Sequence, residues 1–135
     1  MRARQHGQAI AELALGLGAL MLVLAGLVAL SVVTAAELGL VAVAEEAAHA
    51  AALAPSAAEA ARAGTSRGAL VGQGYPLGNG SLAVSVDARQ FGQGGQVQAT
   101  ASYTFTGRDL FLLGPGSLTI SRQHAEPVAL HRSLP

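Results

Sequence analysis

A run of 24 residues without a charged side chain, from position 13 to position 36, constrains the fold of this chain more than any other feature. As an α-helix that rises about 1.5 Å per residue, the run would extend roughly 36 Å, and the hydrocarbon layer of a membrane is about 30 Å thick. The sequence therefore predicts one transmembrane helix over residues 8–36, preceded by a short basic leader, residues 1–7.

The charges on the two sides of this run differ in sign. Arg2 and Arg4 precede it, whereas Glu37, Glu45 and Glu46 follow it. Because positively charged residues favour the cytoplasmic side of a membrane helix, we expect the N-terminus in the cytoplasm. The chain would then be a single-pass protein of the cytoplasmic membrane with its C-terminus outside.

A cleaved secretory signal peptide is the alternative interpretation, with Thr34-Ala35-Ala36 as its cleavage site. Its apolar region would be unusually long, because signal peptides contain apolar regions of about 7–15 residues. It also gives no role to Glu12, the carboxylate that comes directly before the apolar run. The transmembrane interpretation is therefore the stronger of the two.

Three short motifs carry a resemblance to a known family. They are residues 4–15, which include Gly7-Gln8-Ala9-Ile10-Ala11-Glu12, the Ala-rich residues 45–52, and residues 99–105. Together they resemble the TadE-like pseudopilins of tight-adherence (type IVc or Flp-type) pilus systems, which are type IV pilin-like proteins. Family members often have an aromatic residue after the glutamate and a proline in the apolar run; this chain has Leu13, and Gly16 and Gly18, in those places.

The resemblance implies a structural role in pilus assembly. In such families a prepilin peptidase cuts after the glycine, here Gly7, so Gln8 would become the first residue and its amine would usually be methylated. Glu12 would be the fifth residue, whose carboxylate pairs with the N-terminal amine of a neighbouring subunit. The implied partners are the peptidase, other pilin or pseudopilin subunits, the inner-membrane assembly platform and membrane lipid, with this chain acting as a minor subunit.

Glu12 also has a simpler explanation. A carboxylate at the centre of a membrane helix costs about 2.5–3.5 kcal/mol, and less near an end. On this view Glu12 reaches the interface as an acid at the helix start, favoured by the helix dipole. The alternative function is a secreted or membrane-anchored extracytoplasmic binding domain unrelated to pili, whose apolar segment serves only for export or anchoring.

Small residues gather on one side of the apolar helix. At 100° per residue, they occupy a wedge of about 60°. They are Ala11, Ala14, Gly18, Ala25, Ala29 and Ala36. Because small residues let membrane helices approach closely, we expect this face to contact another subunit or membrane protein, unless the wedge arises by chance in an Ala-rich segment.

Beyond the membrane the helical pattern continues as a stalk, residues 37–63, that bends near Pro55. Ser56 and Glu59 form a capping-box pattern, which predicts a second short helix that ends near Gly64. A Gly-rich loop over residues 64–81 would follow, including Gly72 to Gly80.

The last part of the chain alternates apolar and polar residues, which indicates strands. We expect a small antiparallel sheet over residues 82–122, with a hairpin near Gly92 and a third strand that points Leu118 and Ile120 inward. Residues 123–135 would form a loose tail. Such a sheet is marginal alone, so the stalk around residues 41–53 should cover its apolar face. The expected fold class is α+β: a long N-terminal transmembrane and stalk helix followed by a small antiparallel β-sheet, as in pilins.

Composition argues against several kinds of function. Eight Arg balance eight acidic residues, Lys is absent, and so no basic field attracts nucleic acid. Cys is absent, which excludes thiolate metal sites. We therefore expect a protein that is not an enzyme and has no catalytic residues, metal, cofactor or small-molecule substrate.

Two local patterns suggest chemistry but have simpler explanations. Residues 64–68 match a nucleophile elbow, yet an Ala-rich helix rather than a strand precedes them. Glu45 and His49 lie four residues apart, which favours an ion pair over a metal site. The possible partners of an elbow serine would be Asp87, Asp109, His124 and His131, and both histidines are expected in the exposed tail.

Overall fold

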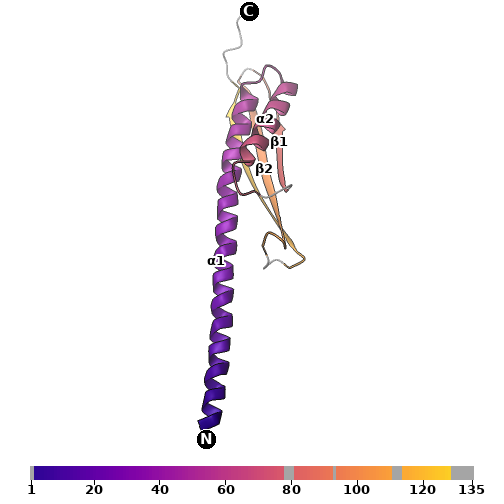
Figure 1. The fold of residues 1–135 in the computed structure, drawn as a ribbon. Helices are drawn as coiled ribbons and strands as arrows, with labels where there is room; N and C mark the ends of the chain where they lie inside the picture. Colours follow the sequence, from indigo (N-terminus) through magenta and orange to yellow (C-terminus); the bar gives the residue numbers. More distant parts are fainter. Residues whose placement is uncertain (1, 78–80, 93, 111–113, 129–135) are drawn as a thin grey trace, which may run out of the picture. The chain divides into compact units, whose positions relative to one another are not determined.

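The computed structural model describes residues 2–77, 81–92, 94–110 and 114–128, with side chains from Gly7 onward. Its elements are two helices followed by three strands (Figure 1). Helix α1 (Arg2–Ala52) and helix α2 (Ala57–Gly72) precede strands β1 (Leu82–Asp87), β2 (Gln96–Thr106) and β3 (Ser117–Pro127). The α+β class with a pilin-like order of elements is thus confirmed.

The chain separates into two compact units, Met1–Val33 and Thr34–Pro135. The first unit is the N-terminal part of α1, and its large apolar side chains are exposed. Those more than half exposed include Ile10, Leu13, Leu15, Leu17, Leu20, Met21, Leu22, Val23, Leu27, Val28 and Leu30. By length and composition the helix could cross a membrane, as predicted. In water such a surface would be unstable without a partner.

In the second unit, the C-terminal part of α1 packs against strand β2 through small side chains. Ala47 and Ala48 of the helix form a buried cluster with Ala99 of the strand. Ala51 and Ala52 lie in a second buried cluster with Val97. Because Ala carries only a methyl group, the helix backbone can approach the sheet closely, and the predicted covering of the sheet by the stalk is confirmed.

Helix α2 begins where the sequence predicts and ends later. The Ser56 hydroxyl accepts a hydrogen bond from the Glu59 backbone N–H at 3.3 Å, as an N-cap does. The helix was expected to stop near Gly64, but it continues to Gly72, so residues 64–72 are helical rather than a loop. The glycines in this stretch are therefore packing positions within the helix, not C-terminal stops.

These glycines form a groove that receives strand β1. Gly64, Gly68 and Gly72 recur every four residues on the buried face of α2. A methyl group added at Gly64 would lie 2.7 Å from a methyl of Val86, and one at Gly68 would lie 2.8 Å from a methyl of Val84. Gly72 faces Leu82 in the same way. Four helical residues rise about 6 Å and two strand residues rise about 6.6 Å. Because these spacings nearly match, each successive glycine of α2 lies opposite the next inward side chain of β1.

The three strands form an antiparallel sheet in the order β1-β2-β3. β2 pairs with β3 over its whole length, from Gln96 opposite Pro127 to Thr106 opposite Ser117. The third strand therefore continues five residues past Arg122, and residues 123–127 are strand rather than tail. Pro127 is tolerated because it is the last residue of an edge strand, where the missing N–H costs little.

The two faces of the sheet differ in chemistry. On the face toward the helices, β2 buries Val97, Ala99, Ala101, Tyr103 and Phe105. Ile120 of β3 lies partly buried opposite Tyr103, as expected, but Leu118 remains 38% exposed opposite Phe105. The other face carries Ser, Thr and Gln side chains, with Gln98 bonded to Gln123 and Thr104 to Thr119. That face is polar but carries little charge.

Candidate functional site

The expected processing segment lies within helix α1. Gly7 and Gln8 are both helical, and a methyl group added at Gly7 would meet no atom within 4 Å. The Gln8 side chain is exposed and donates a hydrogen bond from Nε2 to Oε1 of Glu12 at 3.2 Å. This is the spacing of side chains that face each other across one helical turn. The two residues singled out from the sequence are therefore in contact within one chain.

Glu12 is the only charged residue between positions 8 and 36. Its side chain lies on the exposed surface of the apolar helix, next to the large exposed side chains of Ile10 and Leu13. A carboxylate in such surroundings gains from every hydrogen-bond donor within reach. Gln8 provides one donor from the same helix, and the remaining lone pairs can accept from a second partner.

The wedge of small residues divides between the two units. Ala11, Ala14 and Gly18 are exposed, and Ala25 and Ala29 are partly buried. Ala36 belongs to the second unit, where its side chain is completely buried. Ala36 is thus already covered within this chain and cannot contribute to an open helix face, which corrects the prediction for that residue.

Among the described residues of the second unit, two ion pairs join helix α1 to strand β3. Arg122 donates a hydrogen bond to Glu37 at 2.8 Å, and Nδ1 of His49 lies 2.8 Å from Oε1 of Glu126. The sequence suggested Glu45 as the partner of His49, and that expectation was wrong. The hydrogen bond with Glu126, followed by its negative charge, raises the pKa of His49 above the usual value of 6.5.

The nucleophile-elbow pattern falls inside helix α2. Ser66 lies in the middle of a continuous helix, without the strand and sharp turn that the motif requires. The neighbouring Arg67 pairs with Glu46 of α1 at 2.8 Å, which gives this segment a structural role. His124 is partly buried on β3, not in an exposed tail, and His131 lies outside the described residues.

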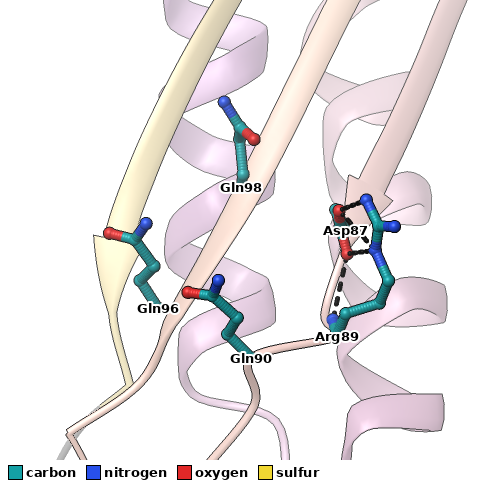
Figure 2. A pocket seen from close by; sticks show the side chains of 5 residues that line it. All are labelled: Asp87, Arg89, Gln90, Gln96 and Gln98. Carbon is teal, nitrogen blue, oxygen red and sulfur yellow. Dashed lines mark hydrogen bonds and ion pairs between the residues drawn. The ribbon is translucent and has the colours of Figure 1, made fainter.

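A shallow pocket of about 390 Å³ lies where β1 ends and β2 begins, lined by Asp87, Arg89, Gln90, Gln96 and Gln98 (Figure 2). Nε of Arg89 donates to both carboxylate oxygens of Asp87, at 3.0 and 2.9 Å. These hydrogen bonds lower the pKa of Asp87 to about 2, so this carboxylate stays ionised. The pocket therefore offers one internally paired charge couple and three amides. No sequence motif marks this pocket, because its residues come from two strands and the loop between them.

No group of three or more His, Asp and Glu side chains that could hold a metal ion occurs among the described residues. Comparisons of the chain with protein-family models, with curated proteins and with solved structures found no match. The functional interpretation therefore depends on the residues and geometry of this chain alone.

Proposed function

We propose that this chain is a TadE-like, pseudopilin-like minor subunit in the assembly of a tight-adherence, type IV-like pilus. A prepilin peptidase cuts it after Gly7, and the part of α1 that precedes the second unit, up to Val33, then anchors it in the cytoplasmic membrane. The N-terminus lies in the cytoplasm, and the second unit with its sheet lies outside. The role is structural rather than enzymatic.

The observation that carries this proposal is the position of Glu12. It is the only charged residue between positions 8 and 36, it is exposed, and it lies one turn from Gln8, which cleavage would make the first residue. A buried or half-buried charge pair adds little stability but can fix register between helices. A free amine at Gln8 of one subunit and Glu12 of the next would provide that register in a filament.

The surface of the first unit supports the same proposal. Large apolar side chains cover most of this helix, which suits lipid, while Ala11, Ala14 and Gly18 leave a strip where a second helix can approach closely. A plain membrane anchor needs the first property and not the second. Pilin-type neighbours or a helix of the assembly platform would occupy the strip.

Substitutions at the processing segment test the proposal in a cell that contains the pilus system. Gly7→Glu should block cleavage, because the bulky charge replaces the glycine that the peptidase accepts. Glu12→Ala should leave cleavage largely intact while it abolishes pilus formation, and Leu13→Ala is a matched control that keeps the carboxylate. Normal pili with Glu12→Ala would contradict the pairing role.

The helix strip can be tested separately, because the chain contains no Cys and single-Cys variants give unambiguous cross-links. Gly18→Cys lies on the strip, whereas Leu20→Cys is at a similar depth on the opposite side of the helix. We expect oxidative cross-linking in membranes at position 18 and little at position 20. Equal cross-linking at both positions would show that the strip has no preferred partner.

The pocket at the sheet favours a second candidate function, an extracytoplasmic binding domain that is anchored by α1 or secreted. Asp87, Arg89 and three glutamines offer donors and acceptors to a small polar ligand. The two functions differ in what Gln98→Leu would do: it should impair a binding domain and leave pilus assembly unchanged. Unimpaired assembly combined with lost ligand capture would support the second candidate.

A further inference from the structure

Cleavage after Gly7 would expose a chemically unstable residue at the new N-terminus. In an N-terminal glutamine, the free α-amine can attack the side-chain carbon Cδ. A C–N bond forms, the bond from Cδ to Nε2 breaks, and ammonia leaves with the amide nitrogen. The product is a five-membered lactam, pyroglutamate, which has no basic amine and therefore no positive charge.

The uncut chain is protected, because the nitrogen of Gln8 is then part of the peptide bond to Gly7 and is not nucleophilic. Protection ends at the moment of cleavage. Any role that needs a charged or methylated amine at Gln8 would then compete with ring closure. One feature of the structure affects the competition between ring closure and a role for the free amine.

That feature is the hydrogen bond from Nε2 of Gln8 to Oε1 of Glu12. Helix side chains tilt toward the N-terminus, so a free Gln8 side chain lies near its own amine. Glu12 lies one turn further along, and a side-chain amide bonded to it is held toward the C-terminal direction. We expect Cδ in that position to lie farther from the nitrogen that would attack it.

We propose that Glu12 acts as a positioning residue that holds the Gln8 side chain away from the new amine and so delays pyroglutamate formation after cleavage. This inference rests on the proposed processing after Gly7. It gives Glu12 a second role within its own chain, distinct from pairing with a neighbouring subunit. It also identifies Gln8 as a modification site whose state decides whether the N-terminus is charged.

The effect expected from one side-chain hydrogen bond across a helical turn is about twofold in the rate of ring closure, because such a bond shifts the side-chain population by about that factor. Away from water the bond is stronger, and the protection should be larger in a membrane than in solution. Methylation of the amine adds bulk at the attacking nitrogen and acts in the same direction.

The test uses the full mature chain that starts at Gln8, released from a removable N-terminal carrier and held in detergent micelles. Mass spectrometry follows the loss of one ammonia over time in the wild type, Glu12→Leu and Glu12→Gln. Glu12→Leu should cyclise about twice as fast as the wild type, whereas Glu12→Gln keeps an acceptor oxygen and should stay near the wild-type rate. Leu13→Ala is the control for a change at a neighbouring position.

A Glu12→Leu chain that cyclises at the wild-type rate, or more slowly, would overturn the inference. Because the carrier creates the N-terminus, this result does not depend on a prepilin peptidase. Failure of the peptidase to cut after Gly7 would refute the proposed processing while the chemical protection by Glu12 could still be measured. The failure of one proposal can therefore be distinguished from the failure of the other.

Discussion

The glycine groove of α2 leads to a sharp prediction for Gly64→Ala. The added methyl would lie 2.7 Å from the carbonyl oxygen of Ala47, 2.7 Å from a methyl of Val86 and 3.1 Å from the Cβ of Ala51. Normal contacts between such atoms are about 3.5–4.0 Å. Because one of the three neighbours is backbone, the clash cannot be relieved by a change of side-chain rotamer alone.

Two effects of this substitution oppose each other. Alanine favours the helix over glycine by about 1 kcal/mol. Overpacking of a tight interior costs about 1–3 kcal/mol. The expected net result is a loss of about 1 kcal/mol in the free energy of unfolding, and for a domain of this size a loss of that order lowers the melting temperature by about 4–8 °C.

Near-ultraviolet circular dichroism of tyrosine can follow this unfolding in detergent micelles, because Tyr103 is buried and the chain contains no Trp. Thr65→Ala is the matched control: the neighbouring position on α2 is exposed, and alanine there should stabilise the helix by about 0.5 kcal/mol. If Gly64→Ala unfolds at or above the wild-type temperature, helix propensity dominates and the groove is not tightly filled.

Three further substitutions test other parts of the fold. Ser56→Ala removes the N-cap of α2 and should cost about 1 kcal/mol in chemical denaturation. Phe105→Ala removes a buried ring from β2 and should cost about 3–5 kcal/mol in the same assay. Glu126→Gln should return the pKa of His49 toward 6.5 in an NMR titration. In the wild type, the contribution of this pair is fully present below about pH 6.5 and is lost as the pH rises through the raised pKa of His49.

Local sequence signals predicted the start of each element better than its end. The Ser56 cap acts on the backbone N–H of Glu59, three residues away, so both partners are visible in one short pattern. The sequence does not predict the end of α2, because Gly64 fits the pattern of a C-terminal stop. A glycine repeated every four residues can equally be a packing face, and that distinction depends on Val84 and Val86, which lie far along the chain.

The contacts of β3 also could not be predicted from short patterns in the sequence. His49 was expected to pair with Glu45, its neighbour on the helix, but its partner Glu126 is 77 residues away. The sequence predicts a loose tail over residues 123–135, whereas the length of β3 is set by β2, which pairs with it up to Pro127. Residues that meet through strand pairing lie far apart in the chain, so their spacing in the sequence does not predict the contact.

One part of the candidate site can be predicted from the sequence and another part cannot. Gln8 and Glu12 are four residues apart on a helix, so their contact follows from spacing alone. The pocket residues Asp87 and Gln98 come together only because β1 pairs with β2, where these two positions lie opposite each other. Ala36 was assigned to the open helix strip because the position where the covered part of α1 begins cannot be read from the apolar pattern.

The most direct test of the proposed function is the intact mass and N-terminal sequence of the full chain, produced with and without a cognate prepilin peptidase. The proposal predicts a chain that starts at Gln8, with or without a methyl group, only when the peptidase is present. A chain that starts at Glu37 would indicate a secreted domain. An uncut chain under both conditions would indicate a plain membrane anchor, and either result would contradict the proposal.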